Sequence, residues 1–365
     1  MIVRIQAFVA ILGLSIAATS AGEKSSVKEA QAARTTASAS VSYHPVDEQL
    51  RSLNFTMTLD VAVADSQLSE FEELITAKFP GTWRPLWLKA WRHELNLVSK
   101  LSPDRRKALF RDFEQVRDIE KELTRITSVD PVLSRMAPVT ARIAEVLDDS
   151  CPTYSYVVGV EAGLKGLKGD YRAAVADWER VRELHRRWVG TDNLMYVADS
   201  EIIAAALVDL KQYAKAKKFL EECSAFYSAA DLTGDSDRIR AVKSTMAMVA
   251  IREGNYEEGI KAMELLVFKR EPRSQLEHLF ESKCLHHLGI AYGKTGRPQV
   301  AEASFESALN GYRKASFVRG HPTVLRILAD QLVFYEESRQ ADKARKLKEE
   351  IEVLKQASRQ PSTRS

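Results

Sequence analysis

The chain has 365 residues, of which 45% are hydrophobic and 28% are charged, a balance that argues against a largely disordered protein. Its net charge of +3, from 53 basic and 50 acidic residues, gives no electrostatic reason to expect nucleic acid as a partner. The low content of Gly (16) and Pro (11) disfavours a turn-rich all-β protein, and three cysteines are too few for a disulfide framework in a chain of this size.

The first 21 residues have the pattern of a signal peptide. One positive charge, Arg4, precedes a mostly apolar run over residues 5–18, and small residues then follow as far as Ala21. A helix needs about 20 apolar residues to span a bilayer, and this apolar run is shorter. We therefore expect cleavage after Ala21 and export to the periplasm, the cell envelope or the extracellular space. An uncleaved N-terminal anchor that tethers the protein to a membrane is the alternative. No membrane span is expected after cleavage.

Two further segments are expected to be flexible. Residues 22–43 are rich in Ala, Ser, Thr, Lys and Glu and predict a disordered tether, and residues 357–365 predict a flexible tail. Asn54-Phe55-Thr56 is a glycosylation sequon, which has meaning only in a eukaryotic secretory pathway.

The three cysteines are Cys151, Cys223 and Cys284. In an oxidising compartment they could form one disulfide and leave one thiol free, and their separations do not indicate which pair would join. Small buried thiols in the core are the favoured interpretation.

Residues 44–150 have helical periodicity throughout and predict an N-terminal helical block. Proline marks four helix starts or ends beside apolar residues at helical spacing: Pro80, Pro85, Pro103 and Pro131. Ser102 is expected to cap the helix that begins at Pro103, and Pro138 predicts a kink or a break in the last helix of the block.

Three tryptophans, Trp83, Trp87 and Trp91, follow one another at intervals of four residues. Such a stripe could form an aromatic binding platform. A core seam is the favoured interpretation, because each tryptophan buries about 200 Å² when it packs inside a protein.

The second half of the chain repeats with a period of about 42 residues. Five segments share a turn followed by the start of a helix, and the first positions of these helices stand at 171, 213, 256, 298 and 341. Each segment carries Ala or Gly three places later, where a small side chain lets two helix backbones approach closely. The pattern predicts five helical hairpins, which must stack into a solenoid to bury their apolar faces.

The fourth segment reads Leu288-Gly289-Ile290-Ala291-Tyr292, followed by Ala301 and Phe305. These residues reproduce the L-G-x-x-Y and A-x-x-x-F motifs of the tetratricopeptide repeat (TPR), so residues 151–356 resemble a TPR domain of about five repeats. The repeats exceed the usual length of about 34 residues and are similar in this to those of kinesin light chains. The resemblance implies an all-α fold, in which an α-solenoid of stacked helical hairpins follows the N-terminal helical block.

The sequence predicts no catalytic residue, no cofactor and no metal, because it contains no phosphate-binding loop, G-x-S-x-G, H-E-x-x-H or C-x-x-C motif. One dense ionisable cluster could bring Glu281, Cys284 and His287 to a zinc ion, which makes a metal-dependent hydrolase the alternative function. Packing inside the fourth repeat explains the same residues and is favoured. His185 is expected on a solvated helix surface.

The resemblance places function on the concave face lined by the first helix of each repeat. The inward positions carried over by alignment are Glu201, Asp209, Ser244, Met248, Arg252, Lys283, His286, Ile290, Lys294 and Arg326. They make the groove acidic in one repeat and basic in the next two, and they lack the Lys/Asn arrangement by which some family members hold a C-terminal carboxylate. The implied function is that of an exported, non-catalytic scaffold for a protein or peptide ligand. A repeat array that serves only for self-association is a further alternative.

Overall fold

The computed structural model describes residues 56–78, 84–229 and 237–359, and the elements assigned in these ranges, α4 to α17, are all α-helices. The expected all-α class is therefore confirmed. The signal peptide, the tether, Asn54 of the sequon and Trp83 lie outside the described residues. Within the ranges that are described, no helix is long and apolar enough to cross a membrane.

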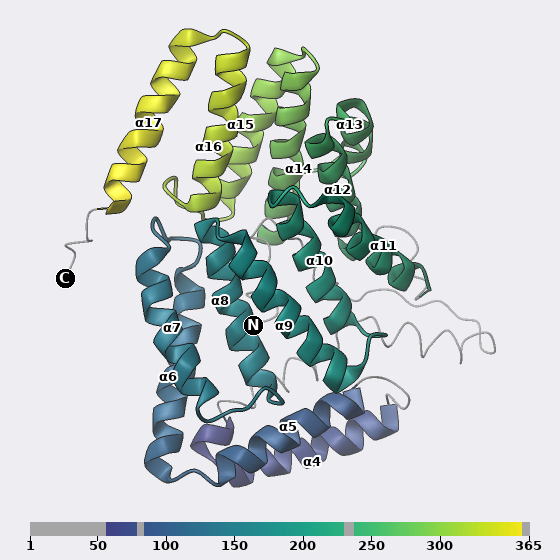
Figure 1. Cartoon of the computed structure of the whole chain (residues 1–365), viewed down its shortest axis with the longest axis vertical. Coiled ribbons are helices and arrows are strands. Elements are labelled where there is room, and N and C mark those ends of the chain that lie inside the picture. The colour runs from purple at the N-terminus through teal and green to yellow at the C-terminus, as the bar shows by residue number, and fades with distance from the viewer. Residues whose placement is uncertain (1–55, 79–83, 230–236, 360–365) are drawn as a thin grey trace.

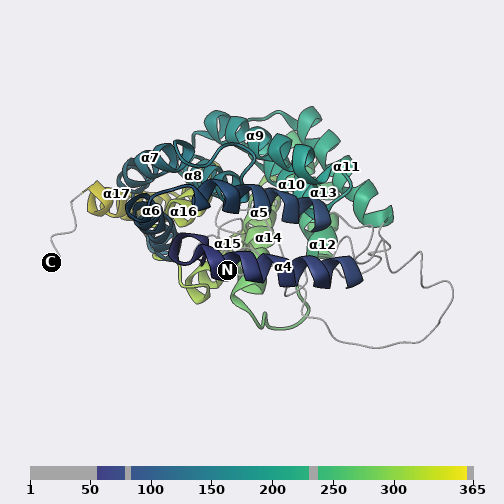
Figure 2. The ribbon, with the colours of Figure 1, turned by 90° about the horizontal axis from the view of Figure 1, so that it is seen from below.

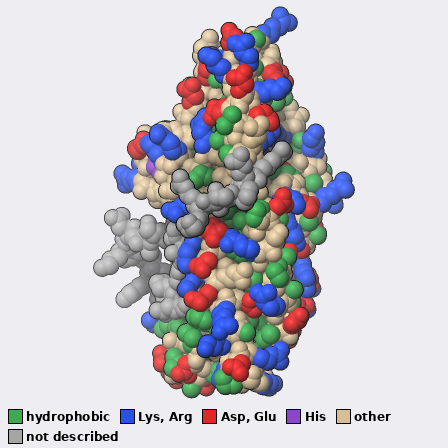
Figure 3. Space-filling view, turned by 90° about the vertical axis from the view of Figure 1, so that its left-hand side faces the viewer, with side chains coloured by type: hydrophobic (Ala, Val, Ile, Leu, Met, Phe, Trp, Pro, Cys, Tyr) green, Lys and Arg blue, Asp and Glu red, His purple; other side chains and the backbone are tan. Residues whose placement is uncertain are grey.

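The N-terminal helical block contributes four helices: α4 (Val61–Lys78), α5 (Arg84–Ser99), α6 (Pro103–Glu122) and α7 (Asp130–Ala144). Helices α4 and α5 lie side by side across one end of the molecule, and α6 and α7 rise from that end along α8 (Figures 1 and 2). The hydroxyl of Ser102 accepts a hydrogen bond from the Arg105 amide and caps α6, as expected. Figure 3 shows that basic and acidic side chains are interspersed on the face it presents, without a large patch of one sign.

The tryptophan stripe belongs to the core. Trp87 and Trp91 are 2% and 3% exposed, and their rings meet edge to face with centroids 6.1 Å apart. Of the kink or break expected at Pro138, the break is wrong, because α7 continues through this residue. The ring removes the hydrogen bond to the Ser134 carbonyl, but Ser134 and Pro138 are both exposed, so water can satisfy that carbonyl.

Ten helices form the repeat array, two in each repeat. The first helices are α8 (Pro152–Lys168), α10 (Leu194–Asp209), α12 (Asp237–Glu253), α14 (Gln275–Lys294) and α16 (Pro322–Glu337). The second helices are α9 (Tyr171–Val189), α11 (Tyr213–Ala229), α13 (Tyr256–Glu264), α15 (Pro298–Lys314) and α17 (Ala341–Arg359). Each second helix begins at the position that the 42-residue period predicts. Helix α17 extends to Arg359, so the tail predicted to begin at residue 357 starts inside this helix.

The same backbone turn joins the two helices of every repeat. One residue in each turn has a positive φ, and these residues are Gly169, Lys211, Gly254, Gly296 and Arg339. The amide of the following residue donates to the carbonyl five positions earlier, at 2.8–3.0 Å, which satisfies an otherwise unpaired carbonyl at the end of the first helix. The period in the sequence is therefore the period of one helix-ending hydrogen-bond motif.

The small residue that follows each turn is buried where two helices cross. These residues are Ala174, Ala216, Gly259, Ala301 and Ala344. At Gly259 a methyl group would stand only 2.4 Å from Cγ1 of Ile251. The close helix crossing predicted from the sequence is confirmed.

The array curves until its last repeat meets the first repeat and the N-terminal helical block. Helix α16 contacts α8, and the loop before α16 bonds to the residues that follow α6 (Figure 1). His321 caps α16 through Nδ1, which accepts from the Thr323 amide, while Nε2 donates to the Leu123 carbonyl at 2.9 Å. The Val318 amide donates to the Thr124 carbonyl at 3.2 Å. The block thus fixes the curvature of the array.

The cysteines are all free and buried, so the favoured interpretation of core thiols is confirmed. Burial raises the pKa of Cys284 to about 12, which keeps this thiol protonated and unreactive at neutral pH.

Candidate functional site

Charged side chains on the first helices of the repeats meet across the concave face, which we call the inner wall. On α16, Arg326 donates to Asp209 of α10 at 3.2 Å and to the Tyr171 hydroxyl at the start of α9 at 3.0 Å. These contacts join residues 117 and 155 positions apart. The side chains of Arg326 and Asp209 remain 34% and 25% exposed, so this part of the wall is open to solvent.

A second group lies one helical turn further along α16. Asp330 accepts a hydrogen bond from Nε2 of His286 at 2.8 Å and lies 3.4 Å from the guanidinium of Arg252. Burial opposes the ionisation of Asp330, but the His286 bond and the Arg252 charge outweigh it and lower the pKa of Asp330 to about 2. Burial also lowers the pKa of His286, so the ring is neutral and donates a hydrogen bond to the Asp330 carboxylate.

Lys283 differs from the other charged residues of the inner wall. It is only 5% exposed, and its Nζ has no hydrogen-bond partner within the described part of the chain. Burial lowers its pKa to about 8, although the charges of Asp209 and Glu201 oppose this shift. The ammonium group is thus still mainly charged at neutral pH without the hydrogen bonds that a buried charge normally makes.

Glu201 is the acidic counterpart of Lys283. It is 7% exposed, one of its oxygens accepts from the Tyr227 hydroxyl, and the other has no partner among the described residues. Burial raises the pKa of Glu201 to about 7, against the opposing charges of Arg238 and Lys283. The middle of the inner wall therefore combines two buried ionisable groups whose pKa values are both shifted by burial toward neutral pH, Lys283 downward and Glu201 upward.

The remaining predicted positions serve packing or lie at the rim. Ser244 and Met248 are buried, and the Ser244 hydroxyl donates to the Ala241 carbonyl of its own helix. Ile290 is half-buried, whereas Lys294 is exposed and pairs with Glu337. The structure thus brings together Asp209, Arg252, His286 and Arg326, and adds Asp330 and Tyr171, which the sequence reasoning missed. Asp330 follows Arg326 by four residues, a spacing that indicates one helix face.

His185 is not on a solvated surface, so that expectation is wrong. The residue is 8% exposed, its Nδ1 lies 2.5 Å from Asp199, and its Nε2 lies 3.4 Å from the Ser155 hydroxyl. The Ser155 hydroxyl donates to the Pro152 carbonyl at 2.8 Å and is 4% exposed, so its proton is not directed at the imidazole. We interpret this Ser–His–Asp set as a buried polar network that joins α8, α9 and α10.

The cluster considered for a metal-dependent hydrolase is not assembled. Among the described residues, the group whose ligand atoms lie close enough together for a metal ion does not include Glu281, Cys284 or His287. Cys284 is fully buried, and burial and the neighbouring ring of His286 lower the pKa of His287 well below its usual range. Packing inside the fourth repeat explains these residues, as the sequence favours.

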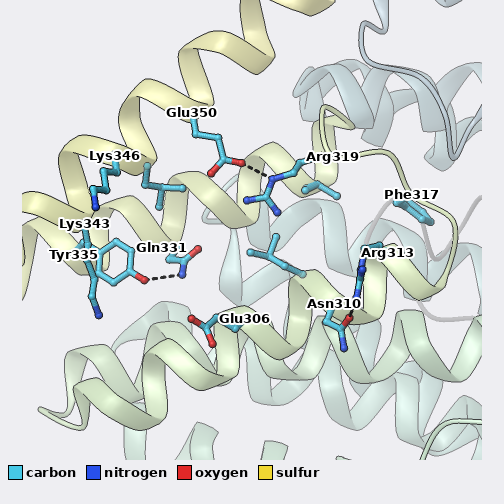
Figure 4. Close-up of a pocket in the computed structure, with 13 residues that line it drawn as sticks. Glu306, Asn310, Arg313, Phe317, Arg319, Gln331, Tyr335, Lys343, Lys346 and Glu350 are labelled. Carbon is cyan, nitrogen blue, oxygen red and sulfur yellow. Dashed lines mark hydrogen bonds and ion pairs between the residues drawn. The ribbon is translucent and has the colours of Figure 1, made fainter.

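A second candidate surface is an open cavity of about 620 Å³ between α15, α16 and α17 (Figure 4). Its apolar lining comes from Leu309, Phe317, Val324 and Leu347. Its polar rim is mainly basic and comprises Arg313, Arg319, Lys343, Lys346, Glu306 and Glu350. Arg319 is held by Glu350 across the mouth of the cavity, as Figure 4 shows.

A protein-family model agrees with the repeat assignment over part of the chain. Residues 283–322, which include the best-formed repeat of the sequence, match the family model described as tetratricopeptide repeat. A crystal structure of putative kinesin light chain nearly identical TPR-like repeats from Podosopora anserina is 20% identical, with 56% of this chain and 96% of that chain covered and a TM-score of 0.40. BtubC (BKLC) from P. vanneervenii is 17% identical, with 68% and 95% covered and a TM-score of 0.37. No curated protein matches the sequence.

Proposed function

We propose that the protein is an exported, non-catalytic scaffold that binds an acidic segment of a partner protein on its inner wall. TPR-like repeats are generally protein-interaction scaffolds, and the repeat array is the feature this chain has in common with them. The observation that carries the choice of ligand is the buried ammonium group of Lys283 without a hydrogen-bond partner among the described residues.

The physical argument concerns the cost of desolvation. A buried charge without hydrogen bonds destabilises the folded protein by several kcal/mol, and a carboxylate brought to it by a ligand would recover part of that cost. Arg326 lies near Lys283 and its side chain is 34% exposed, so an acidic peptide that replaces Asp209 as the partner of Arg326 is brought close to the lysine. Contacts spread over several repeats would supply the remaining affinity.

Site-specific photo-cross-linking in the native cells tests the proposal. The cross-linker is placed at Ile290 on the inner wall and, as the control, at Val300, which is 46% exposed on α15. We expect a partner protein to be cross-linked to position 290 and not to position 300. The cross-linked peptide of that partner should be rich in Asp and Glu. Lys283→Met should abolish the product, whereas the exposed control Lys261→Met should leave it unchanged. A product that survives Lys283→Met would contradict the proposed ligand.

Export is tested by the N-terminus of the protein isolated from those cells. Cleavage after Ala21 predicts a chain that begins at Gly22, as read by mass spectrometry of the intact protein. A chain that still begins at Met1 and sediments with membranes would instead favour the uncleaved anchor.

The cavity between α15 and α17 is the second candidate surface, favoured by its open apolar floor. It would accept an apolar side chain of the same or another partner, with acidic neighbours directed to its basic rim. A cross-linker at Leu309 distinguishes this surface from the inner wall. If a partner is cross-linked at this position and the product persists in the Lys283→Met variant, binding is assigned to the cavity. Light scattering across a dilution series distinguishes binding to a partner, at either surface, from self-association. Self-association predicts that the measured molar mass of the protein rises with its concentration.

A further inference from the structure

The junction between the N-terminal helical block and the first repeat gathers three residue types that bind transition metals. His93 lies on α5, Asp148 lies in the turn after α7, and Cys151 is the residue immediately before α8. One ligand atom from each residue can be chosen so that all three lie within 4.8 Å of one another. We propose that His93, Asp148 and Cys151 form a zinc site.

The distances between the ligand atoms are close to those of a zinc centre. Nε2 of His93 lies 2.8 Å from one oxygen of Asp148, and Sγ of Cys151 lies 3.6 Å from the other. Zinc bonds of about 2.0–2.3 Å in tetrahedral geometry place neighbouring ligand atoms roughly 3.3–3.6 Å apart. The side chains of His93 and Asp148 are half-exposed, so they have room to adjust to the ion.

The charges of the three ligands also suit a divalent ion. A thiolate and a carboxylate neutralise Zn²⁺, and the imidazole completes a sulfur, nitrogen and oxygen set that zinc accepts and that Mg²⁺ and Ca²⁺ do not favour. Binding displaces the Sγ–H proton of Cys151, which passes to solvent. Cys151 is fully buried beneath the other two ligands, so the ion enters from the side of His93 and Asp148, where a water molecule can occupy the fourth position.

A pair of hydrogen bonds holds the ligands in position. Both oxygens of the buried Glu94, the neighbour of His93, accept from Thr153, one from its amide at 2.9 Å and one from its hydroxyl at 2.5 Å. Thr153 is two residues after Cys151, so this contact fixes the start of α8 against α5. Asp148 is oriented by the Ser150 amide, which donates to its carboxylate at 2.8 Å. The bound ion would fasten the N-terminal helical block to the repeat array at this point.

Metal binding to the full chain tests the proposal. The protein is stripped with a chelator, kept reduced, and titrated with Zn²⁺ and with Co²⁺, whose absorption spectrum reports thiolate coordination. We expect one Zn²⁺ per chain, a thiolate-to-cobalt charge-transfer band, no competition from excess Mg²⁺ and a higher midpoint of thermal unfolding with zinc.

Matched variants assign the site. Asp148→Asn keeps an oxygen for the Ser150 amide but loses the anionic ligand, and Cys151→Ser keeps the size of the side chain. Each should weaken zinc binding by at least about 100-fold, a loss larger than changes beyond the ligands usually cause, and Cys151→Ser should also remove the charge-transfer band. Glu281→Gln should leave binding unchanged.

Two results would overturn the proposal. One is a wild-type chain that binds no stoichiometric zinc at micromolar concentration. The other is a folded Asp148→Asn protein, with wild-type circular dichroism, that binds zinc as tightly as the wild type.

Discussion

Replacing Glu201 by Gln should change how the stability of the protein depends on pH. Burial raises the pKa of Glu201 from 4.5 to about 7 in the folded protein, where Arg238, Lys283 and Tyr227 face it from three neighbouring helices. The folded state therefore keeps a proton that the unfolded chain releases between these values. Stability from this group is fully present below pH 4.5 and is lost as the pH rises to about 7. At about 1.4 kcal/mol per pH unit, the loss amounts to roughly 3 kcal/mol.

The assay is urea unfolding, followed by far-ultraviolet circular dichroism, at about pH 5 and about pH 8. Glutamine has no proton to release, so Glu201→Gln should lose roughly 2–3 kcal/mol less than the wild type between the two pH values, since part of the loss already lies below pH 5. The new amide group needs an acceptor at both pH values, and the comparison at the lower pH measures that cost. Glu221→Gln, at an exposed position on α11, is the control and should follow the wild type. Parallel profiles for Glu201→Gln and the wild type would refute the assignment of a largely protonated Glu201.

Three further predictions concern the backbone and the packing of the repeats. Lys211→Gly and Arg339→Gly should each raise the free energy of unfolding by up to about 1 kcal/mol, because both residues have positive φ (58° and 59°); no gain in urea unfolding would contradict this. Gly311→Ala should cost about 1–3 kcal/mol, since its Cβ would lie 2.0 Å from Oγ of Ser282, and adding Ser282→Ala should recover most of the loss; additive losses would contradict the clash. Burial lowers the pKa of His321 from 6.5 to about 4, so its stabilisation is present above pH 6.5 and is lost as the pH falls toward 4. His321→Asn, which keeps a helix cap, should flatten the stability profile in that window, and an unchanged acid limb would refute the buried neutral imidazole.

Features that depend on local backbone geometry could be predicted from the sequence. The helix-ending turn requires one residue with positive φ, which is Gly in three of the five repeats, and a buried small residue follows it five positions later in every repeat. Both requirements act within a few residues and recur in every repeat. The start of each second helix could therefore be placed from the period alone. The same holds for the cap of α6 at Ser102.

Contacts between distant residues could not be predicted in this way. The alignment with the TPR family placed Arg326 on the concave face, but it cannot show that Tyr171 and Asp209 lie within reach, because that depends on the curvature accumulated over several repeats. His185 illustrates the same limit. Its neighbours Arg186 and Arg187 made a solvated position plausible, and only the approach of Asp199 on the next helix explains its burial.

The N-terminal helical block contacts both the first and the last repeat of the array. In an open solenoid each repeat contacts only its neighbours, so the width of the concave face varies with small changes at every interface. Here Arg326 of the fifth repeat bonds to residues of the first two, and His321 bonds to the Leu123 carbonyl of the block. These contacts connect the last repeat to the first two repeats and to the block, and they restrict the width of the concave face. If the proposed function holds, an array fixed in this way would lose less conformational freedom when a ligand binds, which would favour affinity for a segment of matching size over adaptation to many partners.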